Sequence, residues 1–436
     1  MKLLISTLLF LTLLAVSGPS FAQTGSSDTT EFDVNGLKVI FKRRTTAATV
    51  AVGLFTRGGV TDETAKNAGI EGLMWNTAAE ASRSFPREVL QRELARTGTS
   101  IDGSAGYDYG TLAMISTSEN FVPSWDLFAD VARNPSFNDA DLARIKAATI
   151  AGLRDRGASP DGALSELEAK GLFVGHPYSV RPSGTIESIN AITAADLKAF
   201  HNSLMQTSHL LLVVVGDVDE AQVRKLVETA FGSLPRGDYR KPAVPPLSFA
   251  KPSLDIERRA ISTNYIRGSF AAPSLADPDY YAMRVAVTIL QSRVYQAVRV
   301  ERNLSYAPNA DMYTLAANSA NIYVTAVDAN QAVSVMLDEI QRLKTENVNE
   351  DDFGGISSYF LTRYYIDHET NASIAGELAQ YELIGGGWRR SEVFLRKIRA
   401  VTPQEVKAAA LKYMKNLRFV VVGDPAAIDR TVFLQN

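Results

Sequence analysis

Strand-like and helix-like spacings of apolar residues alternate along the chain. At 322–326 apolar residues alternate with Tyr323 and Thr325, the two-residue period of a half-buried strand, whereas at 333–343 they recur with the spacing of one helix face. Strand-like patterns also occur at 37–41, 49–55, 111–116 and 265–270. The segments do not alternate regularly, as parallel βαβ units would. The patterns therefore predict an α+β fold in which mixed, largely antiparallel sheets are covered by helices.

The second half of the chain repeats the first. Segment 189–199 (INAITAADLKA) reappears at 398–408 (IRAVTPQEVKA), an offset of 209 positions, and Thr193 and Thr402 each stand three residues before an acid, the pattern of a helix capping box. Both copies lead to Val-Val-Val-Gly-Asp, at 213–217 and 420–424. Segments 163–168 and 372–377 match at the same offset of 209. Two homologous domains are therefore expected.

The first residues have the pattern of an export signal. Lys2 precedes a continuous apolar run at 3–16, and Ser20-Phe21-Ala22 offers small residues to a signal peptidase. A membrane anchor is the alternative, but the run is shorter than the ~20 residues that span a bilayer, and no later segment is apolar enough. We therefore expect a signal peptide at 1–22 and a periplasmic protein, secretion being the other destination, with no integral membrane segment after cleavage.

Composition also marks the domain boundaries. Small and polar residues at 23–30 predict a flexible linker, and five prolines between 235 and 252 predict an extended, semi-stiff connector. The expected domains are accordingly residues 31–234 and 253–436.

Charge and residue counts exclude several functions. The 436 residues include 45 Lys and Arg against 48 Asp and Glu, so the basic excess of a nucleic-acid-binding protein is absent. No Cys is present, which excludes thiolate metal sites and a thiol nucleophile. None of His176, His201, His209 and His368 lies three to five residues from another His, the spacing of a helical zinc site. We expect His201 and His209 at the surface and a solvated His368.

A set of short motifs resembles a known family. They are Asn67-Ala-Gly-Ile70, Thr-Gly-Thr-Ser-Ile-Asp at 97–102, Ser118-Glu-Asn120, Arg-Asn-Pro-Ser-Phe at 133–137, His176-Pro-Tyr178 and the two Gly-Asp strand ends. Together they resemble the pitrilysin/insulinase peptidases, especially the bacterial and mitochondrial-processing branch, over nearly the whole chain after residue 22. The resemblance implies two homologous α/β-roll domains that form half of a clamshell around an unfolded peptide.

The family's zinc-binding residues have no counterparts in this chain. The inverted motif His-x-x-Glu-His of the family falls on Gly72, Trp75 and Asn76, and the helix that supplies its third ligand, a Glu, matches 145–154, which holds no acid. Gly and Trp cannot ligate zinc, and Asn is a poor ligand for it. We expect no metal to be bound by this chain and expect Trp75 to be a core residue.

A second family feature is retained. Segment 296–306 resembles the family segment whose Arg and Tyr, seven residues apart, reach the substrate beside the zinc, and the two residues correspond to Arg299 and Tyr306. A guanidinium offers fixed donors to peptide carbonyls, and a phenol can donate to an oxyanion. Without the resemblance, Arg299 is a solvated helix residue and Tyr306 a half-buried aromatic.

The resemblance implies a divided enzyme. This chain would be the non-zinc subunit of a heterodimeric zinc metallopeptidase, inactive alone, whose homologous partner carries His-x-x-Glu-His and the zinc. The substrate would be an extended peptide that adds a strand to a sheet edge. The alternative is a catalytically inert peptidase homologue that acts as a binding or scaffold protein, like the respiratory-complex core proteins of the family. An independent non-metal hydrolase is a third possibility, but no triad motif supports it.

Overall fold

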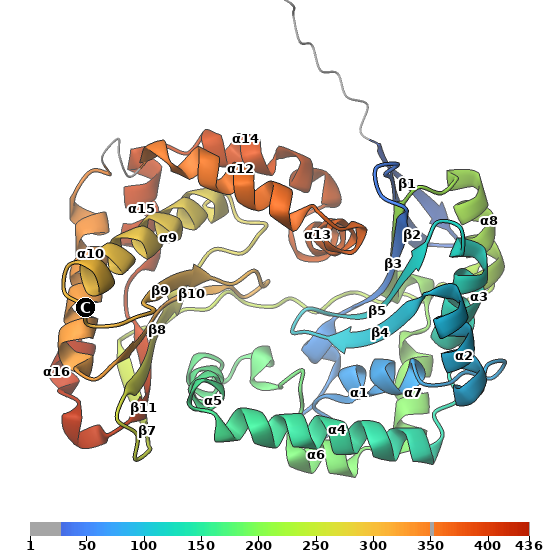
Figure 1. Ribbon diagram of the computed structural model, residues 1–436, viewed down its shortest axis with the longest axis horizontal. Helices are drawn as coiled ribbons and strands as arrows, with labels where there is room; N and C mark the ends of the chain where they lie inside the picture. Colours follow the sequence, from blue (N-terminus) through green and yellow to red (C-terminus); the bar gives the residue numbers. More distant parts are fainter. Residues whose placement is uncertain (1–27, 349–352, 436) are drawn as a thin grey trace, which may run out of the picture.

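The computed structural model describes residues 28–348 and 353–435, which form two sheets with helices packed around them (Figure 1). The predicted signal peptide and most of the predicted linker at 23–30 lie outside the described residues. The linker prediction extends two residues too far, because β1 (Thr29–Val34) begins at Thr29 and pairs with β2 along its whole length.

The first sheet has six strands in the order β1-β2-β6-β3-β5-β4. Only β2 and β6 are parallel neighbours, and in the antiparallel centre Val52 lies opposite Met114 on one side and Val214 on the other. The remaining strands are β2 (Leu37–Arg43), β3 (Thr49–Arg57), β4 (Ser100–Ala105), β5 (Tyr109–Thr117) and β6 (Leu210–Gly216). The helices of this half are α1 (Ile70–Ala78), α2 (Arg87–Thr97), α3 (Phe121–Arg133), α4 (Asp139–Ala158), α5 (Pro160–Leu172), α6 (Ile186–Ala191), α7 (Ala194–Leu204) and α8 (Glu220–Phe231).

The second sheet repeats this order without the counterpart of β1. Its five strands run β7-β11-β8-β10-β9, and β7 and β11 are its one parallel pair. They are β7 (Ser253–Arg258), β8 (Asn264–Ala271), β9 (Asn309–Met312), β10 (Ser319–Ala326) and β11 (Arg418–Gly423). The helices are α9 (Tyr280–Val294), α10 (Ala329–Thr345), α12 (Ile356–Asp367), α13 (Asn371–Ile384), α14 (Phe394–Arg399), α15 (Pro403–Tyr413) and α16 (Arg430–Phe433). The predicted α+β fold, two largely antiparallel sheets covered by helices, is confirmed.

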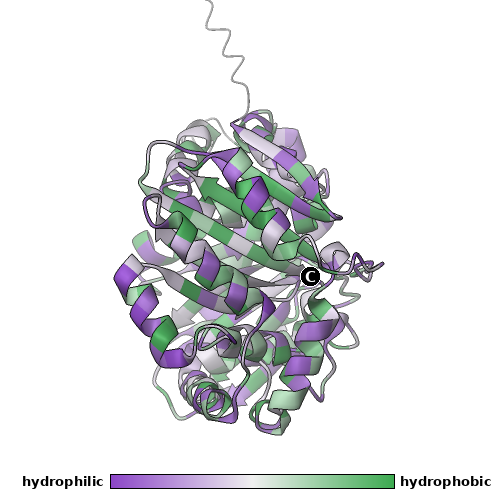
Figure 2. Ribbon diagram, turned by 90° about the vertical axis from the view of Figure 1, so that its right-hand side faces the viewer, coloured by the Kyte–Doolittle hydropathy of each residue, from purple (hydrophilic) through white to green (hydrophobic). Residues whose placement is uncertain are grey.

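Local sequence explains where the repeated helices begin. Thr193 and Thr402 form the predicted capping boxes, in which each Thr side chain accepts the backbone N–H of the acid three residues on and the acid bonds back to the Thr N–H. The hydrophobic strands lie inside, and the helices at the surface carry many of the hydrophilic positions (Figure 2).

Each half contributes one helix to the other half's sheet. Helix α5 packs on β8 and β11, where Leu164 contacts Val420 and Val422, and α13 packs on β3 and β6. A buried ion pair joins Glu168 Oε2 of α5 to Arg267 Nη1 of β8 at 2.6 Å. Strands β6 and β11 are thus covered on both faces, which explains their uninterrupted runs of valine.

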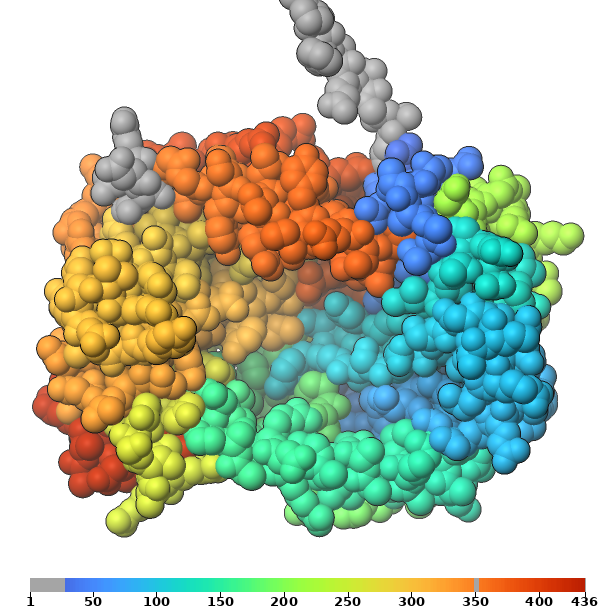
Figure 3. Space-filling view, viewed as in Figure 1, coloured from blue at the N-terminus to red at the C-terminus, as the bar shows by residue number. Residues whose placement is uncertain are grey.

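The segment between the halves is extended and held in place. Residues 235–252 contain neither helix nor strand. The Tyr239 hydroxyl donates to Asp62, and Lys241 Nζ lies 3.2 Å from Asp108 Oδ1, so this segment lies along the first half. The face in Figure 3 is hollowed between α4 and α5 below and α12 and α13 above. Within the described ranges, no helix is long and apolar enough to cross a membrane.

Candidate functional site

The positions that correspond to the zinc motif lie on α1, directly beneath the edge strand β4. Trp75 is 0% exposed, and its ring meets that of His201 edge-on at 5.9 Å, so it is the core residue that was predicted. A Cβ on Gly103 of β4 would lie 2.4 Å from the Trp75 carbonyl carbon. Glycine at 103 therefore lets the strand sit against the helix backbone.

The neighbouring positions offer no metal ligands. Asn76 is exposed, and its Nδ2 donates to the Gly72 carbonyl at 2.7 Å, one turn back. A groove of about 520 Å³ opens above it, lined by residues 98–103 and by Ile145 of α4. Across residues 28–348 and 353–435, no group of three or more His, Asp or Glu side chains is arranged to hold a metal ion. The residues at this site do not fit zinc.

Two buried carboxyl groups beside this site were missed from the sequence. Glu63 accepts the N–H groups of Gly69 and Glu71 at 2.8 and 3.1 Å and so caps the start of α1. Burial raises the pKa of Glu63 to about 7 and that of Glu71, which accepts the Thr56 hydroxyl, to about 8. The signal available in the sequence was Glu71 itself, an acidic residue within the otherwise apolar helix turn at 70–75.

Arg299 and Tyr306 are brought together at the surface of the second half. Residues Tyr295–Val300 form a π-helix after α9, a deviation that is frequent at functional sites. Arg299 Nη1 donates to the Tyr306 carbonyl at 2.5 Å, and its Cζ lies 3.9 Å from the Tyr306 ring centroid. Tyr306 is 79% exposed and thus not the half-buried aromatic expected without the family.

Tyr295 is a third member of this cluster, and sequence reasoning did not identify it. Its ring centroid lies 5.4 Å from Arg299 Cζ, so the guanidinium has aromatic rings from Tyr295 and Tyr306 nearby. Its position four residues before Arg299, one helical turn away, was the only signal in the sequence.

Two of the histidine predictions were wrong. His201 and His209 are buried, not at the surface, and their Nε2 atoms lie 2.8 Å from the carbonyl oxygens of Ala132 and Arg57. Burial lowers the pKa of His201. His368 is half-buried, and its Nε2 lies 2.6 Å from Glu377 Oε2. These three histidines therefore connect neighbouring elements, and none of them belongs to a metal-binding group among the described residues.

The free edges of the two sheets differ. In β4, residues 101, 103 and 105 turn their backbone groups away from β5, and no hydrogen bond to these groups occurs among the described residues. In β9, Gln291 Oε1 accepts the Ala310 N–H at 2.7 Å, and Arg284 Nη1 donates to the Met312 carbonyl at 2.8 Å. The edge of β4 can thus accept another strand, whereas side chains of α9 occupy the edge of β9.

Comparison with protein families agrees with this architecture. Residues 38–166 match the family model described as "Insulinase (Peptidase family M16)", and residues 191–357 match "Peptidase M16 inactive domain". The chain belongs to the M16 peptidase family. It is a family member without the zinc motif, and its fold is that of an M16 clamshell half.

Individual M16 proteins resemble the chain along most of its length. The uncharacterized zinc protease ML0855 of Mycobacterium leprae is 23% identical over 411 residues, which cover 91% of this chain and 92% of that one. Mouse mitochondrial cytochrome b-c1 complex subunit 1 is 22% identical over 259 residues, covering 59% and 54%.

Solved M16 structures share the fold. The peptidase M16 inactive domain from Pseudomonas fluorescens matches with a TM-score of 0.82 at 22% identity, covering 91% of this chain and 98% of that one. The periplasmic protease PqqL from Escherichia coli matches with a TM-score of 0.77 at 14% identity, and the match covers 93% of this chain but 49% of PqqL.

Proposed function

We propose that this M16 protein is the non-zinc subunit of a two-chain zinc metallopeptidase that cleaves unstructured peptides. The observation that carries the proposal is the contrast between its two halves. Arg299 and Tyr306 are assembled and accessible on one half, while Gly72, Trp75 and Asn76 leave the other half without ligands. A chain that keeps the substrate-contacting groups and lacks the metal site is suited to complete a site in another chain.

The chemistry assigned to the pair follows from its geometry. A guanidinium carries five N–H donors. Arg299 donates one of them to the Tyr306 carbonyl, so the others remain for the carbonyl groups of a substrate. The exposed Tyr306 hydroxyl would donate to the oxyanion that forms on the attacked carbonyl. Removing one such donor typically lowers turnover about a hundredfold or more.

The proposed partner is a homologous subunit that carries His-x-x-Glu-His and the zinc. This chain matches about half of PqqL, and a second M16 half of similar size would supply what this one lacks. The unpaired edge of β4 would hold an extended peptide by strand addition, because it presents free backbone donors and acceptors. The apolar segment at 3–16 supports export, and we propose the periplasm as the site of action.

The test compares the chain alone with a mixture containing an exported homologue that has the intact motif. We expect no zinc in the isolated chain by metal analysis, and cleavage of an unstructured fluorogenic peptide by the mixture only. Arg299→Ala and Tyr306→Phe should each lower the turnover of the mixture about a hundredfold. Arg43→Ala, at the exposed ion pair with Asp217, is the control and should leave it unchanged. Zinc-dependent cleavage by the chain alone would overturn the proposal, as would full turnover with both variants.

A catalytically inert binding or scaffold protein is the second candidate. The similarity to cytochrome b-c1 complex subunit 1 favours it, because that relative is named as a subunit of a respiratory complex. A stable complex with the homologue whose turnover does not depend on Arg299 or Tyr306 would select this alternative.

A further inference from the structure

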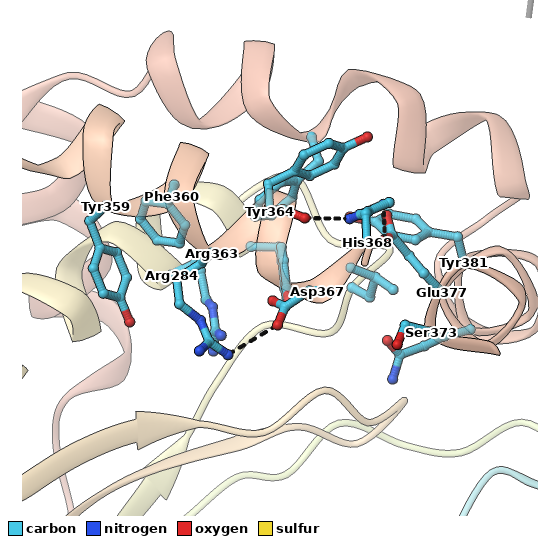
Figure 4. Close-up of a pocket in the computed structure, with 14 residues that line it drawn as sticks. Arg284, Tyr359, Phe360, Arg363, Tyr364, Asp367, His368, Ser373, Glu377 and Tyr381 are labelled. Carbon is cyan, nitrogen blue, oxygen red and sulfur yellow. Dashed lines mark hydrogen bonds and ion pairs between the residues drawn. The ribbon is translucent and has the colours of Figure 1, made fainter. Parts of the chain in front are cut away.

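A pocket of about 370 Å³ lies between α9, α12 and α13, away from the sites described above (Figure 4). Aromatic rings from all three helices form much of its wall. In Figure 4 the side chains of Arg284, from α9, and Arg363, from α12, point in the same direction, away from the body of α12. Both line the pocket. The aromatic residues of the wall are Tyr280, Tyr359, Phe360, Tyr364, Tyr381 and Phe394.

The third cation of the pocket already has a partner. Burial opposes charge on His368, but the bond to Glu377 raises its pKa above the ordinary value. Its Nδ1 lies 2.7 Å from the Tyr364 carbonyl, so both ring nitrogens are occupied. His368 and Glu377 therefore neutralise each other and leave the two arginines as the groups that can receive a ligand.

The charged partners of the two arginines are solvent-exposed carboxylates, and Arg284 Nη1 also donates to the Met312 carbonyl at 2.8 Å. Arg363 Nη2 lies 3.1 Å from Asp367 Oδ1, one turn along α12, with the side chains 52% and 56% exposed. Arg284 lies 3.8 Å from Asp311 Oδ1, beyond hydrogen-bond distance. Exposed pairs of this kind contribute little to stability because water and salt screen them, whereas a carboxylate held by two guanidinium groups gains short, charge-assisted hydrogen bonds. An incoming carboxylate can therefore displace the water-screened contacts.

The pocket lies a fixed distance from Arg299 and Tyr306. Arg284 precedes Arg299 by fifteen residues along α9 and the π-helix, or roughly 22 Å at 1.5 Å per residue. The chain then returns beside α9 through β9, and Met312, whose carbonyl Arg284 contacts, follows Tyr306 by six residues, which span at most roughly 20 Å at 3.3 Å per residue. A separation of about 20 Å satisfies both routes, and it is the length of six or seven residues of an extended peptide.

We propose that this pocket binds the carboxylate of a peptide, in the first place its C-terminal carboxylate, through Arg284 and Arg363. The aromatic wall would pack against the last side chain of the peptide. A bound terminus would place the peptide bond six or seven residues upstream beside Arg299 and Tyr306. That spacing rests on the proposed function, whereas binding of the carboxylate does not.

Binding is tested on the full chain alone, by fluorescence anisotropy with three labelled versions of one unstructured peptide. One version ends in a free carboxylate, one in an amide, and one in an amide preceded by Glu. We expect the free acid to bind at least tenfold more tightly than the plain amide. Tight binding of the Glu amide would identify acidic side chains as a second source of the same carboxylate chemistry. Equal affinity of the acid and both amides would overturn the proposal.

Two variants test whether the preference for the free acid arises in this pocket. Arg363→Gln removes an exposed arginine of an i,i+4 pair and should abolish the preference for the free acid. Arg43→Gln removes an arginine, 60% exposed, from the exposed Arg43–Asp217 pair and should preserve it. A preference that survives Arg363→Gln in a folded protein would overturn the assignment to this pocket.

Cleavage by the mixture with the zinc-bearing homologue tests the spacing. In a series of peptides of increasing length, mass spectrometry should find the cut six or seven residues from the free C-terminus, and amidation should disperse the cuts. Cuts that ignore the terminus would refute the spacing. If the chain prefers the free acid but turnover does not change in Arg299→Ala, the proposed function is refuted and the carboxylate pocket is supported. If turnover depends on Arg299 but the acid and the amide are bound and cleaved equally, the pocket is refuted and the proposed function is supported.

Discussion

Replacing Glu168 by Gln should loosen the connection between the two halves. Glu168 belongs to α5, the helix of the first half that packs on the second sheet. Its two carboxylate oxygens contact Arg267 Nη1 at 2.6 Å and the Ser269 hydroxyl at 2.5 Å. The two charged side chains are only 7% and 14% exposed. Glutamine keeps the size of the side chain but leaves the buried guanidinium without its counter-charge.

The expected loss is about 3–5 kcal/mol of the free energy of unfolding, the usual cost of breaking a buried ion pair by removing one partner. Unfolding entropy of roughly 2.1 cal/mol/K per residue, over about 400 residues, converts this loss to a fall of about 4–6 °C in Tm. Differential scanning calorimetry measures the change. Glu346→Gln, which breaks the exposed pair with Arg342, is the control and should shift Tm by less than about 1 °C.

A second variant separates the charge effect from simple loss of packing. Arg267→Met, added to Glu168→Gln, should recover part of the lost stability, because it removes the buried charge that the single variant leaves without a partner. Arg267 Nε already lacks a hydrogen-bond partner in its buried position, which adds to this expectation. A loss below about 1 kcal/mol for Glu168→Gln, or a double variant no more stable than the single, would refute the reasoning.

Three further predictions concern α1 and the π-helix. Protonation of Glu71, whose pKa is raised to about 8, favours the folded state, so the free energy of unfolding should fall as pH rises between about 4.5 and 8. Glu71→Gln should flatten that slope by up to about 1.4 kcal/mol per pH unit in urea titrations, and an unchanged slope would count against the assignment. Gly103→Ala should destabilise the chain by about 1–3 kcal/mol in the same assay, because its Cβ would press on the Trp75 backbone; a neutral effect would contradict that contact. Tyr295→Leu should lower turnover of the proposed mixture several-fold while Tyr295→Phe retains it, since the ring and not the hydroxyl stacks near Arg299; equal loss in both variants would argue against stacking.

The repeat made the architecture predictable from the sequence. The shared offset of 209 and the capping residues Thr193 and Thr402 correspond to matched helices, and the Val-Val-Val runs lie in the interior strands β6 and β11. The exchange of α5 and α13 was not predictable, although 163–168 and 372–377 were matched. Periodicity shows that a helix has an apolar face, but it does not identify the sheet that covers that face.

The candidate site was predictable only where residue identity excluded a chemistry. Gly72 and Trp75 could be dismissed as metal ligands from their side chains alone. The burial of Glu71 could not be predicted, because its partner Thr56 comes from a strand that lies fifteen residues away. The burial of His201 could not be predicted for the same reason, because the hydrogen-bond partner of its ring is a backbone carbonyl of α3, which is distant in sequence.

The unpaired edge of β4 also affects how the chain behaves without a partner. An exposed strand edge is a template on which another copy of the same chain can pair, the usual origin of edge-to-edge aggregation. The six residues of β4, Ser-Ile-Asp-Gly-Ser-Ala, are short, mostly small or polar, and include one charge, features that weaken such pairing. The edge is therefore suited to brief, reversible pairing with a passing peptide and poorly suited to growth into a fibre.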